Sequence, residues 1–340
     1  MGALIIAAWP QTPVRPTGLW YDTFLALLGF RLPSGFYRLG HAGCLLVSER
    51  TDRAHYFDCG RYECPPQMCR VRDDVRDPDV ALSVRARFAA DGSLSNGEDV
   101  LLELAGIRAT HGEGFMVASI MGGLDFEAAY REAKGLQARM YPFRHLASRS
   151  LNCTRFLLRI TPFARASMAV RILEMWSRLA GPSPLFLARV ANRVGPTYMV
   201  EQGRLSRCGR WSAFLRGGPP LRCSPAGDGC ERPAVSPQGE SDVSAEARWL
   251  RGTAAGKWIA LTHEPGLGSR ELRFRRWSDS GRLDCDRVFA LSEGSELDPG
   301  RPFEPDYPTD CQECTLRQDG RTSHLERSRE FCNVFPSAPS

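Results

Sequence analysis

The 340-residue sequence contains almost no lysine: Lys134 and Lys257 are the only two, so its formal net charge of +5 is carried by arginine. We attribute this bias to composition and not to a nucleic-acid partner. The sequence also lacks any run of about 18 apolar residues, the length of a membrane span. Its first apolar run, ALIIAAW, has no basic residue before it and a proline after it, unlike a signal peptide. We therefore expect a cytoplasmic protein with no stable membrane insertion.

Cysteine is abundant, with twelve residues in the chain, but the cysteines are irregularly spaced. A disulfide framework is typical of short secreted chains, and this chain is long and shows no export signal. We therefore predict that most of these cysteines are reduced and buried in the core.

Composition divides the sequence into two parts. The stretch 217–244 is rich in Gly, Pro and Ser and has no apolar period, which is typical of a linker. We predict a first domain at 1–195, a partly disordered linker at 196–244 and a small β-rich domain at 245–335. The last domain shows no catalytic pattern, and we expect it to bind a partner or cover a cleft. Its predicted core is formed by three tryptophans, Trp249, Trp258 and Trp277.

The first domain alternates strand-like and helix-like segments. Strands are predicted at 4–10, 40–47, 54–62, 79–89 and 113–121, and helices at 19–30, 95–107, 124–140 and from Cys153 to about Ile160. A six-residue polar loop joins 40–47 to 54–62 as a hairpin. The order predicts an α+β fold, with helices on one side of a mostly antiparallel sheet.

The hairpin offers a candidate base and a partner for it. If its turn is centred between Arg50 and Thr51, Asp58 opposes Gly43 and lies diagonally beside His41. His55 then points to the other face of the sheet. A register shift of one residue would exchange Asp58 and His55, so this choice depends on the turn. Gly40, before His41, allows another backbone to approach closely.

The segment SLNCTRFLLRI places Cys153 at the start of an amphipathic helix. The positive end of a helix and nearby arginines favour the thiolate, which is the attacking form of cysteine. Asn152, directly before it, fits an N-cap or a side-chain donor to a developing oxyanion. Tyr141 is a second candidate donor and His111 a candidate for the pocket rim, although packing explains either residue as well.

The order of these residues resembles circularly permuted papain-like proteins. The lecithin:retinol acyltransferase family and the PPPDE-type peptidases share one chain order: a histidine at a strand start, then a polar residue on the next strand, then NC before a helix. In NlpC-type peptidases the cysteine comes first in the chain. The pieces IIAAWP, GHAGCLLV, YFDCGRY, THGEGFMVAS and NCTRFL resemble an uncharacterised bacterial family of this permuted group over about residues 3–195. The resemblance implies Cys153 as nucleophile, His41 as base and Asp58 as its orienting partner, and it brings no established substrate. The acyltransferases have a histidine in place of Asp58 and NCEH in place of NCTR, so their lipid substrate is not implied.

We therefore predict a thiol hydrolase or acyltransferase that acts on an amide, ester or thioester of an unknown acyl or peptide substrate, without a cofactor. The alternative is a non-catalytic binding module that keeps the papain-like fold. A third interpretation, a zinc-stabilised nucleic-acid binder, relies on Cys311 and Cys314 in C-x2-C spacing with His324 and Cys332. Residues 139–216 hold fourteen arginines and two acids, but no nucleic-acid motif accompanies them, so we expect no nucleic-acid partner. The sequence says nothing about oligomeric state.

Overall fold

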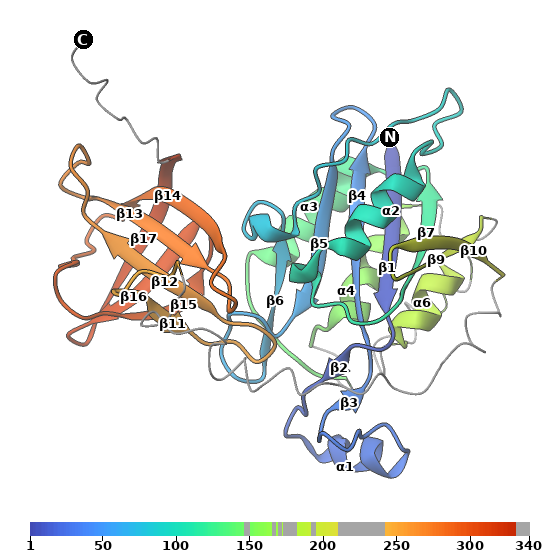
Figure 1. Ribbon diagram of the computed structural model, residues 1–340, viewed down its shortest axis with the longest axis horizontal. Coiled ribbons are helices and arrows are strands. Elements are labelled where there is room, and N and C mark those ends of the chain that lie inside the picture. Colours follow the sequence, from blue (N-terminus) through green and yellow to red (C-terminus); the bar gives the residue numbers. More distant parts are fainter. Residues whose placement is uncertain are drawn as a thin grey trace. The chain divides into compact units, whose positions relative to one another are not determined.

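The computed structural model divides the chain into two compact units (Figure 1). The first unit comprises Met1–Tyr62, Pro66–Asp74 and Asp79–Ala226, and the second comprises Glu63–Pro65, Val75–Pro78 and Gly227–Ser340. Within these units the structure describes residues 1–145, 150–164, 168, 172, 182–191, 195–209 and 242–330.

The first unit is built on an eight-stranded sheet. Its strands are β1 (Gly2–Trp9), β4 (His41–Ser48), β5 (Ala54–Gly60), β6 (Met68–Asp73), β7 (Met116–Gly122), β8 (Tyr141–Pro142), β9 (Thr197–Glu201) and β10 (Arg204–Cys208). They lie in the order β10-β9-β7-β1-β4-β5-β6-β8, and neighbouring strands are antiparallel. A separate two-stranded ribbon pairs β2 (Pro13–Val14) with β3 (Tyr37–Arg38).

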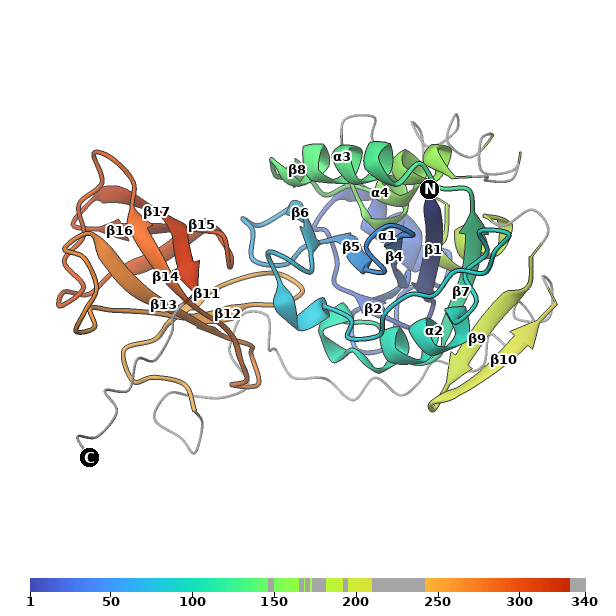
Figure 2. The ribbon, with the colours of Figure 1, turned by 90° about the horizontal axis from the view of Figure 1, so that it is seen from above.

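Helices cover both faces of this sheet (Figure 2). The α-helices of the unit are α1 (Trp20–Leu27), α2 (Gly97–Gly106), α3 (Phe126–Gln137), α4 (Cys153–Ile160) and α6 (Pro184–Val190). Single 3-10 turns occur at Pro78–Val80, Arg108–Thr110 and Thr161–Phe163. Side chains of α3, α4 and α6 pack on one face of the sheet, and α2 packs on the other.

Burial on both faces explains the continuous apolar run of β1. Leu4 and Ile6 point to the side of α3 and α4, whereas Ile5 and Ala7 point to the side of α2. All eight residues of β1 are buried. A strand buried on both faces is apolar at every position and does not alternate with polar residues.

Two expectations about this unit were wrong. The helices do not all lie on one side, because α2 buries Val100, Leu101 and Leu104 against the opposite face. Residues 79–89 form no strand: they run irregularly over the face that α2 covers, where Val80 and Ala86 are buried. Alternating burial in this segment arises from loop packing and not from a pleated strand.

The first sheet also extends into the range 196–244, which was expected to be a linker. Strand β9 pairs with β7, and β10 pairs with β9, so residues 197–208 complete one edge of the sheet. The apolar residues Met199 and Val200 are buried there. Residues 210–241 lie outside the described residues.

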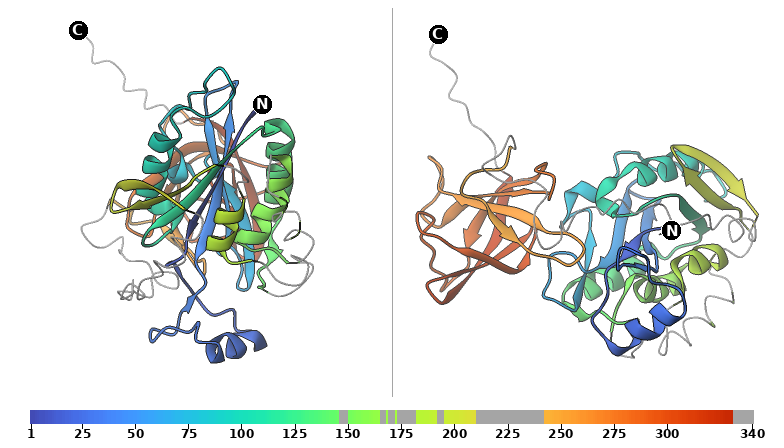
Figure 3. Two further views of the ribbon diagram at one scale, coloured as in Figure 1. Left: turned by 90° about the vertical axis from the view of Figure 1, so that its right-hand side faces the viewer. Right: turned by 60° about the horizontal axis from the view of Figure 1, so that its bottom comes forward.

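The second unit is a seven-stranded antiparallel sheet in the order β11-β12-β13-β14-β17-β16-β15. Its strands are β11 (Arg248–Leu250), β12 (Lys257–Thr262), β13 (Glu271–Trp277), β14 (Leu283–Leu291), β15 (Glu304–Thr309), β16 (Glu313–Gln318) and β17 (Arg321–Glu330). The sheet curls around a core that includes Phe274, Phe289 and Leu316 (Figure 3). The Tyr307 hydroxyl on β15 donates to the Arg251 carbonyl after β11, at 2.7 Å. The predicted tryptophans form a smaller cluster in which Trp258 and Trp277 are buried and Trp249 is half-buried.

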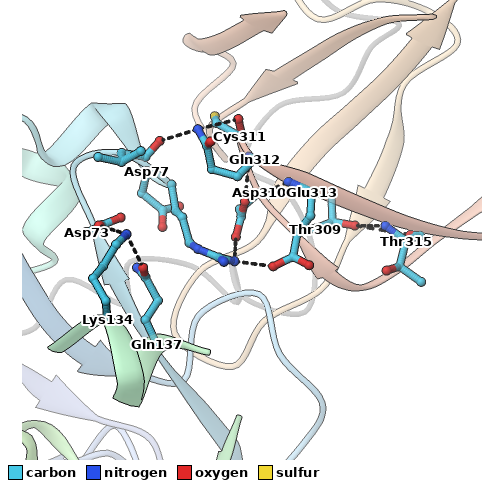
Figure 4. A network of polar contacts seen from close by, with 12 residues as sticks. Asp73, Asp77, Lys134, Gln137, Thr309, Asp310, Cys311, Gln312, Glu313 and Thr315 are labelled. Atoms are coloured by element: carbon cyan, nitrogen blue, oxygen red, sulfur yellow. Dashed lines mark hydrogen bonds and ion pairs between the residues drawn. The ribbon is translucent and has the colours of Figure 1, made fainter. Parts of the chain in front are cut away.

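Buried charges organise the second unit as well. The Arg276 side chain is 0% exposed and donates from Nε to Asp284 and from Nη1 to Asp77, at 2.8 and 3.1 Å. Lys257 donates to the other oxygen of Asp284 at 2.6 Å. Arg76, next to Asp77 in the chain, pairs with the carboxylates of Asp310 and Glu313 (Figure 4). The short segment 75–78 is thus an integral part of the second unit.

The described cysteines are free thiols, as expected. Seven of these nine residues are buried, and Cys153 and Cys208 are partly exposed. Among the residues that the structure describes, no helix is long and apolar enough to cross a membrane.

Replacing Leu46, a fully buried residue of β4, with Ala should lower the free energy of unfolding of the first unit by about 2–5 kcal/mol, because the lost contacts leave a cavity. Chemical denaturation measures the change. Leu102→Ala, at a position 39% exposed, is the matched control and should cost far less. Equal losses in the two variants would contradict the placement of the core.

Candidate active site

His41 and Asp58 meet across the β4–β5 hairpin. Gly43 pairs with Asp58, which is the register that the hairpin turn predicted. The Nε2 atom of His41 lies 2.9 Å from Oδ2 of Asp58. His55 is on the other face of the sheet, and its Nδ1 atom lies 3.2 Å from Oδ2 of Asp74. Asp58, and not His55, is therefore the partner of His41.

The backbone around His41 is tightly packed. Gly40 has a φ of +74°, and a Cβ atom there would lie 3.0 Å from the carbonyl oxygen of Trp9. Trp9 pairs with His41 across β1 and β4, and the two rings stack with centroids 6.0 Å apart. Glycine at position 40 and the Trp9 ring together restrict where the imidazole can point.

Asp58 is completely buried and accepts hydrogen bonds from several donors besides His41. Tyr56 and Tyr62 donate their hydroxyls to Oδ2 at 2.9 and 2.6 Å. Arg72 donates from Nε to Oδ1 at 2.8 Å and from Nη2 to Oδ2 at 3.1 Å. A buried carboxylate is tolerated only with such compensation, and this bidentate ion pair with two hydroxyls supplies it.

Arg72 and Tyr62 also contact each other directly. The Arg72 guanidinium carbon lies 3.7 Å from the centroid of the Tyr62 ring, in a cation–π contact. Arg72 Nη2 further donates to the carbonyl oxygen of Ala109 at 2.6 Å. We call Tyr56, Tyr62 and Arg72 the Asp58 clamp.

Arg72 and His41 keep Asp58 charged. Burial by itself raises the pKa of the Asp58 carboxyl, but the charge of Arg72 and the hydrogen bond and charge of His41 outweigh it. The pKa of Asp58 consequently lies well below its usual range, so the group is a carboxylate at neutral pH.

Cys153 is the first residue of α4, and local interactions fix its position. The Asn152 side-chain oxygen accepts from the backbone N–H of Arg155 at 2.9 Å, which caps the helix. Phe156 and Leu157 anchor the same helix in the core. Cys153 itself is partly exposed, whereas Cys44, Cys59 and the other described cysteines except Cys208 are buried.

His41 interacts with both Asp58 and Cys153. Burial lowers the pKa of His41, and the hydrogen bond and charge of Asp58, together with those of Cys153, more than offset this effect. The net result raises the pKa of His41 from 6.5 to about 9. The structure thus brings an imidazole, a carboxylate and a thiol together from three different elements.

The further candidate residues occupy different places. Asn152 is the cap, and its amide donates to the Arg144 carbonyl at 3.0 Å. Tyr141 lies on β8, where its hydroxyl accepts from Arg139 Nε at 2.9 Å. His111 stacks on Tyr62 with ring centroids 5.5 Å apart and has a left-handed backbone, with φ of 55°. Of these residues, His111 lies next to the clamp and Asn152 next to Cys153.

The candidate zinc residues do not converge. Cys314 pairs with Leu325 on the core face of the second sheet, whereas the adjacent pair Thr315 and His324 places the histidine at the surface. Cys311 is buried, and Cys332 lies outside the described residues. Among the described residues no group of three or more His, Cys, Asp or Glu side chains is placed to hold a metal ion.

Four residues of the site were not predicted from the sequence: Trp9, Tyr56, Tyr62 and Arg72. Tyr56 and Asp58 share a face because they are two residues apart on a strand, which the sequence could have revealed. Arg72 pairs with Asp58 across β5 and β6. That contact could be foreseen only with β6, a six-residue strand that was not predicted from the sequence.

Comparisons with known proteins relate each unit to a family. Residues 4–168, slightly under half of the chain, match the family described as type VI secretion system effector TseH-like. Residues 247–328 match the DUF6695 C-terminal domain. The crystal structure of the type VI secretion system effector TseH matches with a TM-score of 0.41 and 16% identity, covering 61% of this chain and 98% of that chain. No curated protein matches the chain.

The raised pKa of His41 makes a prediction about stability. Because the folded pKa of about 9 exceeds the ordinary 6.5, the protonated imidazole stabilises the fold. This stabilisation should be complete below pH 6.5 and be lost as the pH rises through 9. Unfolding free energies of the unmodified protein and His41→Gln, measured across this range, should converge with rising pH. His263→Gln, at an exposed residue outside the site, is the control, and a constant difference for His41→Gln would contradict the assignment.

Proposed function

We propose that the first unit is a papain-like cysteine hydrolase or acyltransferase that acts on an amide, ester or thioester. The observation that carries this proposal is the position of His41, which hydrogen-bonds to the Asp58 carboxylate and to the Cys153 thiol. A nucleophile, a base and a group that orients the base are the parts that thiol catalysis requires.

Each residue then has one role. Asp58 occupies Nε2 of His41, which leaves Nδ1 as the nitrogen that exchanges a proton with the Cys153 thiol. The thiolate attacks the substrate carbonyl carbon, and His41 returns the proton to the leaving amine, alcohol or thiol. The acyl group, now bonded to the sulfur, passes to water or to another acceptor that His41 deprotonates. The fixed clamp keeps Asp58 ionised through both steps, because Arg72 and the two tyrosines do not need to move.

The backbone at the start of α4 is the natural oxyanion donor. The amide of Asn152 is already bonded to Arg144, and the Tyr141 hydroxyl is bonded to Arg139. The backbone N–H of Cys153 lies at the positive end of its helix, where negative charge is favoured. We therefore assign oxyanion binding to this N–H group, and we assign to Asn152 the positioning of the helix start.

Two further observations support the papain-like part of the proposal. The similarity of residues 4–168 to TseH-like effectors covers the part of the chain that holds His41, Asp58 and Cys153. The order of these residues along the chain is that of the circularly permuted papain-like proteins, so we retain the permutation as part of the proposal. The effector similarity also favours an action outside the producing cell, and the cytoplasmic location expected from sequence stays a prediction.

Cysteine labelling tests the proposal, and the chain offers a matched control. Cys153 and Cys208 are the two described cysteines that are partly exposed. Iodoacetamide at neutral pH should modify Cys153 much faster, as peptide mass spectrometry would show. Cys153→Ala should abolish the fast phase and Cys208→Ala should leave it unchanged. His41→Ala should slow the fast phase, because the Cys153 thiol loses the imidazole that takes its proton.

Turnover is measured with activated thioester and ester substrates. Cys153→Ala should reduce hydrolysis to background, and His41→Ala should lower kcat/KM by about 10²- to 10⁴-fold, the typical contribution of a general base. Unchanged labelling in Cys153→Ala would reject the nucleophile. Fast labelling of Cys153 that His41→Ala does not alter would favour the binding module instead.

A further inference from the structure

A folded arm, residues 13–39, projects from the first unit between β1 and β4 (Figures 1 and 3). It consists of the ribbon β2–β3 and the helix α1. Arg61 attaches its base to the unit by donating to the Pro16 carbonyl at 2.9 Å. The arm is therefore a folded structure, and its exposed side chains form a defined surface.

Large apolar side chains dominate the outer surface of α1, where Thr23 is the one exposed polar residue. Trp20, Phe24, Leu27 and Leu28 are 76%, 54%, 80% and 56% exposed, and their spacing places them on one face of the helix. Tyr21 faces the other way and is buried. Helices of globular proteins turn their apolar face to the core, so this arrangement is the reverse of the usual one. A contiguous exposed apolar patch marks an interaction site.

The patch is bordered by positive charge. Arg31 follows the exposed Phe30 in the chain, and the backbone N–H of Arg38 donates to the Phe30 carbonyl at 2.9 Å. Both arginine residues are exposed. Asp22 is the one acidic residue between positions 13 and 39. Its carboxylate accepts from the N–H groups of Thr17 and Gly18, each at 2.8 Å, and so serves the internal structure of the arm.

We propose that the arm binds the surface of a membrane that contains anionic lipids. Tryptophan, phenylalanine and leucine beside arginines are the composition of interfacial helices, in which apolar side chains enter the headgroup region and arginines meet lipid phosphates. An acidic protein partner would match the charge but would not need so many large exposed apolar side chains. The arm lies on the membrane and does not span it, because α1 has eight residues.

This membrane contact would lie at the end of the sheet that carries His41. The arm leaves β1 after Trp9 and enters β4 at His41. The Tyr21 hydroxyl accepts from the backbone N–H of His145 at 3.2 Å, and the preceding carbonyl, of Arg144, holds the Asn152 cap of the Cys153 helix. A lipid surface under α1 is thus adjacent to the elements that carry the thiol and the imidazole.

Co-sedimentation of the full chain with vesicles tests the proposal. The protein should pellet with vesicles of phosphatidylcholine mixed with phosphatidylglycerol, more weakly with phosphatidylcholine alone, and less as salt rises. Phe24→Ser with Leu27→Ser should weaken binding at least about tenfold, because two apolar side chains are lost from the interface. Arg31→Gln with Arg38→Gln should weaken binding to the anionic vesicles about 25-fold, or about fivefold for each arginine.

The matched control is Leu102→Ser with Leu283→Ser, two exposed leucines outside the arm that should leave binding unchanged. Circular dichroism establishes that each variant is folded. Absence of pelleting with anionic vesicles at low salt, or full pelleting of Phe24→Ser with Leu27→Ser, would overturn the proposal. So would a concentration-dependent dimer, seen by ultracentrifugation, that forms in place of vesicle binding and dissociates in the same variant. Vesicle binding requires no turnover, so its failure is distinguishable from failure of the thiol chemistry.

Discussion

The buried carboxylate of Asp58 is the constraint on which the first unit depends. An unpaired charge in the interior is costly, so each group that pairs with Asp58 also contributes to the stability of the fold. The partners come from separate places: His41 begins β4, Tyr56 lies on β5, Tyr62 follows β5 and Arg72 is on β6. They meet only when the three strands pair in one register. The charge therefore selects the register of this part of the sheet, in addition to shaping the site.

The same constraint explains why the site lies at the end of the sheet. Asp58 and Tyr56 point to the face that α2 covers, whereas α4 packs on the opposite face through Phe156 and Leu157. The body of the sheet separates the carboxylate from the thiol. His41 is the first residue of β4, where the sheet ends, and there a ring bonded to Asp58 can also reach the start of α4. Gly40 and Trp9 hold it at that junction.

Local chemistry made much of this arrangement predictable from sequence. The β4–β5 hairpin and the Asn152 cap of α4 each depend on a few adjacent residues, so the sequence alone indicates them. The clamp was not predictable in this way, because Arg72 acquires its role from pairing with Asp58 across two strands. The strand predicted at residues 79–89 was wrong for the opposite reason. Its period-two pattern is a local signal, but the chain there packs as a loop. In both cases, the role of Arg72 and the loop at 79–89, the position in the fold determined the structure and the residue types did not.

Two places in the first unit reverse the usual distribution of polar and apolar residues. They differ in what offsets the free-energy cost. Inside, Asp58 and Arg72 are charged and buried, and each satisfies the other within the unit. Outside, Trp20 and Leu27 are apolar and exposed. Nothing in the described part of the chain covers them. A buried charge without a partner would have prevented folding, so its partner had to be internal. An exposed apolar face costs far less while the chain is free, and its stabilisation can come from outside. The buried Asp58–Arg72 pair therefore explains how the candidate site is held in place. The exposed apolar face of α1 indicates where the protein binds a partner surface.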